Sequence, residues 1–187
     1  DDEIPDYKTA AGNSSPDDEH REIPVVAQAN FQEQLLSQLY TLDLDDTEYH
    51  IAEQLIGSID DDGYLRREVA SIVDDLAFGQ NIETNAQEIA GLVSKIQLFD
   101  PPGICAVTLQ ECLILQLKRM PDGKPVRNAI EILDKHFNEF IKKHYEKIQR
   151  HLVLNDEDFK KVINIIIKLN PKPGAAFAVT NKAENYI

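Results

Sequence analysis

Apolar side chains recur at three- and four-residue intervals through most of this sequence, and no other feature constrains its fold as strongly. Residues three or four apart share one face of an α-helix, so each run predicts an amphipathic helix with one buried face. The clearest runs are Phe31, Leu35, Leu39 and Leu42, then Ile51, Leu55 and Ile59. No segment alternates cleanly between apolar and polar residues, as a half-buried strand would. The sequence therefore predicts an all-α fold.

Cap and turn residues divide these runs into about eight helices. Side chains that accept a backbone N–H at a helix start are predicted at Asp45, Thr84, Thr108 and Asn155, and the two threonines have the spacing of a capping box. Glycine and proline are expected to end helices. Three of the predicted helices begin at Phe31, after Asp45 and after Thr84. The other five cover residues 67–78 (ended by Gly79), 109–118, 126–137, 140–152 and 157–169. The last is so rich in isoleucine that a strand is its alternative.

The chain is expected to form a helical bundle of two packed subdomains. Residues 1–28 are acidic, lack apolar periodicity and are predicted to be a disordered linker. The segment 121–125, in which two prolines flank a glycine, is the predicted seam between subdomains over 29–120 and 121–174. Residues 175–187 are predicted to be an extended tail.

Charge is distributed unevenly along the chain. The net charge is −14, with −6 in residues 1–25, −11 in 26–120 and +3 in 121–187. An acidic surface repels a phosphate backbone, which excludes non-specific nucleic-acid binding by the first two-thirds. A basic protein surface is the natural partner for that part. The alternative, that acidity only keeps the protein soluble, stays open.

The sequence has no signal segment and no apolar run long enough to span a membrane, so a soluble, cytoplasmic protein is expected. Cys105 and Cys112 are too far apart on one helix to bridge, and they are predicted to be buried thiols in a reducing compartment.

The residues suggest no catalytic or metal site. The segment from Ser58 to Leu65 imitates a calcium loop, but Ser58 and Val69 stand where chelating carboxylates are needed. It is therefore predicted to be an acidic turn, with Tyr64 and Leu65 packed into the core and the tyrosine hydroxyl in water. No histidine pair has helical zinc spacing, and no phosphate-binding loop or nucleophile elbow occurs. We expect no cofactor and no enzymatic activity.

Basic residues gather near the C-terminal end, where two predicted helices outline a helix-turn-helix. They form a candidate DNA-proximal face made of Lys142, Lys143, Lys147, Arg150, Lys160 and Lys161. Acids at 156–158 open the second helix, where base-reading residues belong, so a solvated basic face is the favoured interpretation.

Three stretches together resemble the bacterial sigma-54 family. They are IAEQLIGSIDDDGYL over residues 51–65, IQLFDPPGICA over 96–106 with LQECL over 109–113, and LNPKPG over 169–174. Their order and spacing make the resemblance specific, and it covers most of residues 30–187. One departure is Val107, where the family often has arginine, which puts in doubt any polar contact made there.

The resemblance implies a core-binding region that docks on RNA polymerase at the β-flap and β′ surfaces. It also implies that promoter DNA is read mainly by a missing C-terminal part, and that an activator ATPase acts through a missing N-terminal part. The candidate polymerase-binding residues lie in two turns and are Asp60, Asp61, Asp62, Tyr64, Leu65, Phe99, Asp100, Pro101, Pro102, Gly103 and Ile104. The same turns equally serve to reverse the chain and close the core.

Two other functions stay open on the sequence alone. One is a helical scaffold or adaptor that binds another basic protein. The other is a DNA-binding protein that uses the basic C-terminal helices.

Overall fold

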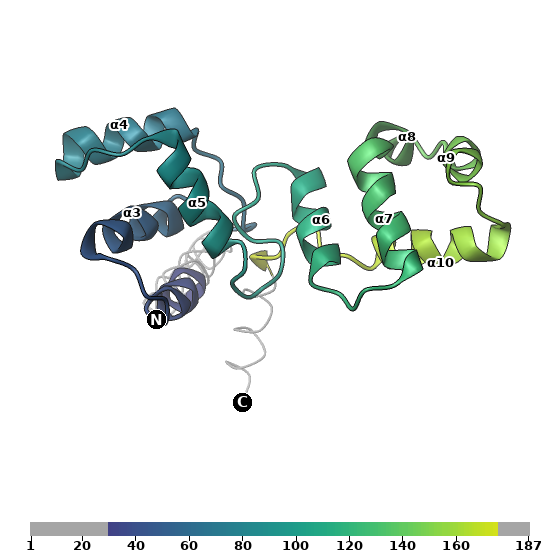
Figure 1. Cartoon of the computed structure of the whole chain (residues 1–187), viewed down its shortest axis with the longest axis horizontal. Helices are drawn as coiled ribbons and strands as arrows, with labels where there is room; N and C mark the ends of the chain where they lie inside the picture. The colour runs from purple at the N-terminus through teal and green to yellow at the C-terminus, as the bar shows by residue number, and fades with distance from the viewer. Residues whose placement is uncertain (1–29, 176–187) are drawn as a thin grey trace, which may run out of the picture.

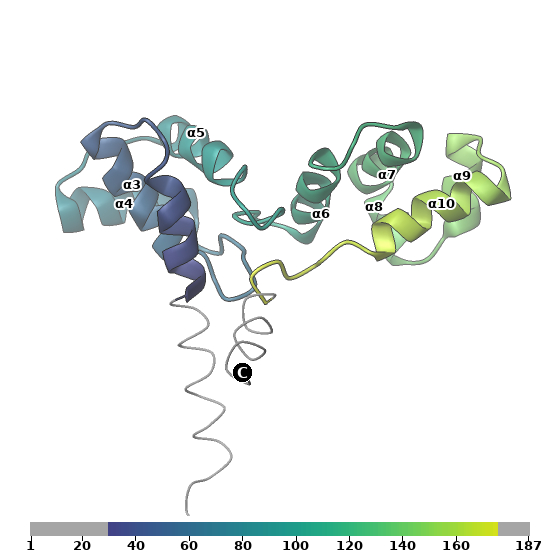
Figure 2. The same cartoon turned by 90° about the horizontal axis from the view of Figure 1, so that it is seen from below.

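The computed structural model describes residues 30–175, and its regular structure in that range is helical. Figures 1 and 2 show an elongated molecule with two helical lobes. The extended pairings among these residues are two isolated bridges, Ile59 with Leu65 and Tyr64 with Ala106. The all-α prediction is confirmed. The predicted linker over 1–28 and the predicted tail beyond residue 175 lie outside the described residues.

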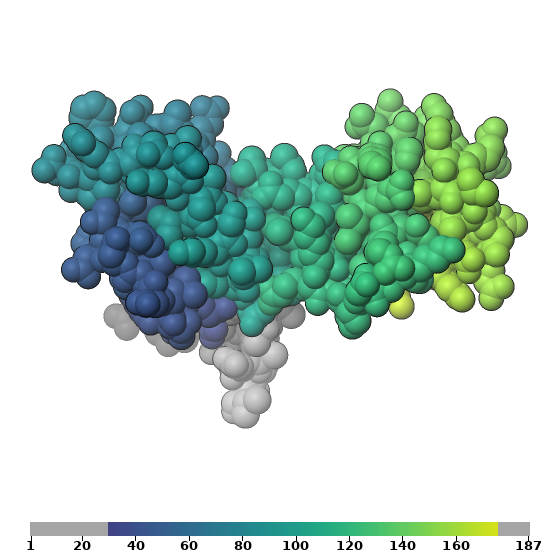
Figure 3. Space-filling model, in the orientation of Figure 1, coloured from purple at the N-terminus to yellow at the C-terminus, as the bar shows by residue number. Residues whose placement is uncertain are grey.

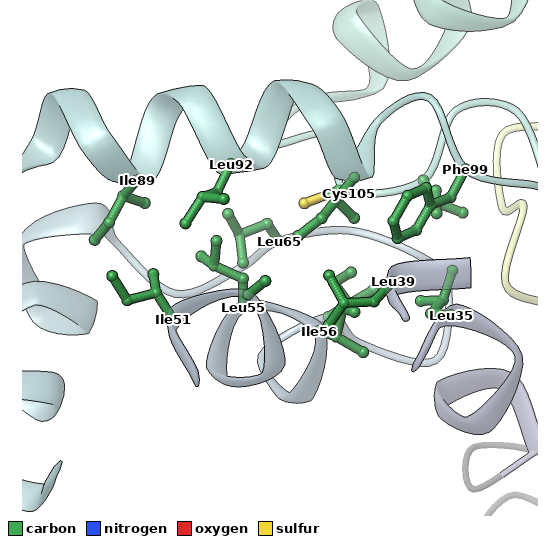
Figure 4. Close-up of a cluster of buried hydrophobic side chains, with 14 of the residues drawn as sticks. Leu35, Leu39, Ile51, Leu55, Ile56, Leu65, Ile89, Leu92, Phe99 and Cys105 are labelled. Atoms are coloured by element: carbon green, nitrogen blue, oxygen red, sulfur yellow. The ribbon is translucent and has the colours of Figure 1, made fainter. Parts of the chain in front are cut away.

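The N-terminal lobe, residues 30–105, contains a helix over residues 30–39, α3 (Asp46–Gly57), α4 (Val69–Gln80) and α5 (Ala86–Ile96). All three labelled helices pack against one another, and α3 makes its largest contact with α5. Figure 4 shows Ile89 and Leu92 of α5 facing Ile51 and Leu55 of α3. These aliphatic side chains are those that the helical spacing predicted to be buried.

The C-terminal lobe, residues 109–169, contains α6 (Leu109–Lys118), α7 (Lys124–Lys135), α8 (Phe137–Ile141), α9 (Tyr145–Leu152) and α10 (Asp156–Ile167). Helix α7 packs against both α6 and α10. The isoleucine-rich segment is helical, as favoured, with Ile163 and Ile166 buried and Ile167 exposed. The two lobes are distinct in the space-filling view (Figure 3).

Three of the four predicted helix caps are confirmed. The side chains of Asp45, Thr108 and Asn155 each accept a hydrogen bond from the backbone N–H three residues later. The cap predicted at Thr84 is wrong by one residue. Asn85 is the N-cap and accepts from the N–H of Glu88 at 2.9 Å, while the Thr84 hydroxyl donates to the Glu88 carboxylate.

Several predicted helix boundaries also differ from the structure, as in α7, which covers Lys124–Lys135 rather than 126–137, and α10, which ends at Ile167 rather than at residue 169. Helix α4 begins at Val69, continues through Gly79 and ends at Gln80, and its C-cap Asn81 adopts the left-handed conformation that asparagine tolerates. The predicted helix over 140–152 is broken into α8 and α9. Lys143 is left-handed there, and the N–H of His144 donates to Glu139 O, which is the pattern of a Schellman motif. The break lets Phe140 and Tyr145 both pack on the C-terminal core.

The boundary between the two lobes does not coincide with residues 121–125, where the net charge of the sequence changes sign. Leu113 and Leu117 of α6 belong to the C-terminal apolar cluster, while the N-terminal cluster ends at Cys105. The predicted seam at 121–125 therefore lies inside one lobe, where residues 121–123 lead into α7 and residues 124 and 125 already belong to that helix. No helix within residues 30–175 is long and apolar enough to cross a membrane.

Candidate functional site

The turn over residues 60–65 is closed by one carboxylate. Asp60 Oδ1 accepts the backbone N–H groups of Asp62 at 3.0 Å and Tyr64 at 2.9 Å, and its other oxygen pairs with Arg66. Gly63 has φ of 101°, a conformation that glycine adopts readily. The Asp60 carboxylate is thus used inside the turn. Among residues 30–175, no group of His, Cys, Asp and Glu side chains is arranged to hold a metal ion.

The second turn, over residues 97–106, pairs directly with the first. Leu65 N–H donates to Ala106 O at 2.9 Å, and Cys105 N–H donates to Gly63 O at 2.8 Å. All four residues are buried. Two stretches about 40 residues apart in sequence are therefore joined through their main chains.

Gly103 brings the second turn close to α6. Its φ is 95°, and a Cβ built on it would lie 2.8 Å from Gln116 Nε2 and 3.0 Å from Cys112 Sγ. Any side chain at this position would be strained by the backbone conformation and would collide with α6. Glycine is therefore required for this approach.

The third stretch, over residues 169–174, returns from the end of α10 to the N-terminal lobe (Figure 2). The Tyr64 hydroxyl donates to Pro171 O at 2.6 Å, and Gly174 N–H donates to Asp62 O at 2.9 Å. A Cβ on Gly174 would collide with the carbonyl oxygen of Asp61. The prediction that the Tyr64 hydroxyl reaches water is wrong, because a carbonyl of the third stretch accepts its hydrogen bond.

Gln116 of α6 joins the same place from the C-terminal lobe. Gln116 is 8% exposed, and it is the one polar residue that is buried among the described residues. Its Nε2 donates to Asn170 O at 2.6 Å and its Oε1 accepts from Asn170 N–H at 2.8 Å. We call this meeting of residues 60–65, 97–106, 116 and 170–174 the joint. It connects the two lobes.

Burial raises the pKa of two side chains of the joint, Tyr64 and Cys105, and of Cys112 beside it. Desolvation raises the pKa of the Cys105 thiol to about 12 and is also the main cause of raised pKa values for Tyr64 and Cys112. All three groups are therefore neutral at pH 7, and neither cysteine is an activated thiolate. The prediction of two buried, unpaired thiols is confirmed.

The corner at Phe99 and Asp100 is held from both sides. Gln38 exchanges two hydrogen bonds with the main chain of Asp100, at 2.7 and 2.8 Å. Arg119 donates to Leu98 O at 2.9 Å and to Phe99 O at 3.3 Å, and it also pairs with the Asp100 carboxylate. Sequence reasoning missed Gln38, Gln116 and Arg119. The one local signal was Gln116, a polar residue set among the apolar positions of α6.

The structure brings the predicted polymerase-binding residues together but buries their apolar members. Tyr64, Leu65, Phe99, Gly103 and Ile104 are buried. The acids are more accessible, with Asp61 and Asp100 exposed and Asp60 and Asp62 half-buried, as are Pro101 and Pro102. These turns thus close the core, which was the alternative considered for them. A role in docking stays a prediction and rests on their acidic groups.

The basic candidates lie apart from the joint, around α8, α9 and α10. Lys142, Lys143, Lys147, Arg150, Lys160 and Lys161 are all exposed. None of them takes part in the ion pairs found within residues 30–175.

Comparison with known proteins supports the family resemblance seen in the three stretches. The family model for the sigma-54 factor core binding domain matches residues 22–187. The RNA polymerase sigma-54 factor of Vibrio anguillarum is 37% identical over 144 residues, 76% of this chain and 29% of that protein. That of Azotobacter vinelandii is 32% identical over 173 residues, 90% of this chain and 34% of that protein.

The RNA polymerase sigma-54 factor of Bacillus subtilis is 29% identical over 151 residues, 81% of this chain. The chain spans about a third of the length of the curated relatives it matches. By its match over residues 22–187, the chain belongs to the sigma-54 factor family and contains the core binding domain of that family.

Proposed function

We propose that this chain binds core RNA polymerase as the docking region of a sigma-54 transcription initiation factor. The observation that carries the proposal is the match of residues 22–187 to the core binding domain. A stable protein–protein interface needs about 800 Å² on each partner. The fold supports the proposal, because two helical lobes held by a joint offer a surface broad enough for such an interface.

Charge supports an acidic docking surface on the N-terminal lobe. Residues 30–105 contain 15 acids and 3 bases, a net charge of −12, whereas residues 109–169 contain 9 acids and 12 bases, a net charge of +3. Complementary charge speeds association and selects partners. We infer that the N-terminal lobe faces basic surfaces of polymerase, the β-flap and neighbouring parts of β′ being our candidates. The acids of the 60–65 turn and Asp100 would lie at that interface.

The test is binding of the purified 187-residue chain to core polymerase, measured over a range of salt concentrations. We expect a complex that weakens as salt rises, because exposed charges are screened. Absence of a complex at low salt would contradict the proposal. Binding to unrelated basic proteins with the same affinity would favour the scaffold or adaptor function instead.

The exposed cations of α8–α10 favour one further contact. We propose that Lys142, Lys143, Lys147, Arg150, Lys160 and Lys161 lie near promoter DNA when the factor is bound to polymerase. Reading of the promoter is assigned to a C-terminal part of the full-length protein and the response to an activator ATPase to an N-terminal part. The protein would then act in the cytoplasm, at the nucleoid, without a cofactor or catalysis of its own.

The basic face is tested with a double variant, Lys142→Glu with Lys143→Glu, in the full-length factor bound to polymerase. Lys124→Glu, an exposed change at the start of α7, is the control. We expect weaker promoter binding and a smaller salt dependence for the double variant only, because each phosphate contact releases counterions. Equal promoter binding by the unmodified factor, the double variant and the control would show that these basic residues face solvent and not DNA.

A further inference from the structure

A groove runs along the outer side of α5 on the N-terminal lobe. It consists of two adjoining hollows that share Lys95 as a lining residue. One hollow, of about 260 Å³, lies between α5 and the start of α3 and is bordered by Glu48 and Glu88. The other lies between the end of α5 and the helix over residues 30–39, with Leu98 and Asp100 at its far end. We call the two together the α5 groove.

The α5 groove combines an exposed apolar side chain with acidic residues. Ile51 and Leu92 are among the lining residues of the smaller hollow but are almost completely buried, and Figure 4 shows both directed into the core between α3 and α5. Leu98 is 71% exposed, so its side chain is not needed to fill the core of this chain. Leu98 is thus the exposed apolar group of the α5 groove, with Lys95 beside it and the acids Glu48 and Glu88 at the other end. An exposed apolar group with charged neighbours is typical of protein-binding surfaces.

Gly91 lies on the wall of the groove, and no contact within residues 30–175 requires glycine at this position. It lies in the interior of α5, its φ is not left-handed, and a Cβ added there would meet no atom within 4 Å. Glycine inside a helix is unfavourable compared with alanine. Gly57 and Gly79 are also helical glycines with open space around an added Cβ, but Gly91 is a lining residue of the α5 groove. A side chain at Gly91 would narrow the groove, whereas glycine permits the close approach of another backbone.

We propose that the α5 groove is the seat of a short segment of core RNA polymerase, which places an apolar side chain on Leu98 and a Lys or Arg beside Glu48 and Glu88. The inference rests on the proposed function and adds the location. The helical residues 88–96 of α5 span about 12 Å at about 1.5 Å per residue, which suits about two turns of a partner helix. The net charge of −12 on the N-terminal lobe favours a basic segment over an acidic one.

The experiment compares groove variants with matched controls in the 187-residue chain. Gly91→Leu fills the groove, and Gly79→Leu makes the same change at an exposed glycine of α4, where a Cβ also meets nothing within 4 Å. Leu98→Asp is matched by Phe78→Asp, since Phe78 is 89% exposed on α4. Binding to core polymerase and the melting temperature are measured for all four.

We expect the two groove variants to raise the Kd for polymerase at least tenfold, and the two controls to change it less than twofold. Both glycine variants should melt at or above the temperature of the unmodified chain, so lost binding cannot be ascribed to unfolding. Unchanged binding by Gly91→Leu and Leu98→Asp would overturn the inference while leaving the proposed function intact.

Two other outcomes identify different occupants. If the unmodified chain fails to bind polymerase, the proposed function itself is refuted, and this inference with it. If the chain dimerises and Gly91→Leu makes it monomeric, the groove binds a second copy of the chain and the inference is overturned.

Discussion

Gln116 on α6 exchanges two hydrogen bonds with the main chain of Asn170, 54 residues further along the sequence, at 2.6 and 2.8 Å. The pair ties the segment beyond α10 to the helix that begins the C-terminal lobe. The same segment reaches the N-terminal lobe through Tyr64 and Asp62. These polar contacts, together with the packing of Tyr64 and Ala106 on Cys112 of α6, hold the two lobes at the joint.

Replacement of Gln116 with leucine should lower the free energy of unfolding by about 1–2 kcal/mol. The change leaves the N–H and carbonyl of Asn170 without their partner in a partly buried place, and an unpaired buried polar group costs about 1–3 kcal/mol. Urea unfolding followed by circular dichroism measures this. Gln87→Leu, an exposed change on α5, is the control and should stay within about 0.5 kcal/mol.

Gly103→Ala should destabilise the protein by more than about 2 kcal/mol. Alanine would have to adopt the backbone conformation of Gly103, at φ 95°, which residues with a side chain rarely adopt. Its Cβ would also lie 2.8 Å from the Gln116 side chain. Gly79→Ala should instead stabilise it by up to about 1 kcal/mol, because Gly79 is helical and exposed. Thermal unfolding distinguishes the two, and equal effects would show that Gly103 is not required at the joint.

Arg119 should matter more than its ion-pair partner. Arg119→Met removes the donor to Leu98 O and Phe99 O and should cost about 1–2 kcal/mol. Asp100→Asn removes only an ion pair whose carboxylate is 78% exposed, and exposed pairs contribute about 0–1 kcal/mol. Chemical denaturation of both variants gives the comparison. A larger loss for Asp100→Asn would contradict this ranking.

Stability should fall as the pH rises above about 9. Burial raises the pKa of the Cys105 thiol from 9.0 to about 12, so the folded chain holds this proton more tightly than the unfolded chain does. The contribution is complete below pH 9 and is lost as the pH rises through 12. In Cys105→Ala the free energy of unfolding should decline less steeply between pH 9 and 11. Parallel curves for the two proteins would mean that this thiol is not responsible.

Local signals in the sequence predicted most helices and several of their ends. The bounds of α6 match the predicted residues 109–118, because Thr108 caps its start and the apolar spacing is regular. The break between α8 and α9 was missed because it contains no glycine or proline. Lys143 adopts a left-handed conformation there since Phe140 and Tyr145 both gain from packing on the same core.

By itself the sequence determined the helical class and the caps at Asp45, Thr108 and Asn155, since each depends on residues close together in the chain, and it determined the family through the order and spacing of three stretches. Only the tertiary structure decided that three separate turns form one joint, that Gln116 is buried and that α5 borders a groove. Tyr64 and Pro171 are 107 residues apart, and contacts of that range form only when both lobes have packed. Local periodicity carries no information about them.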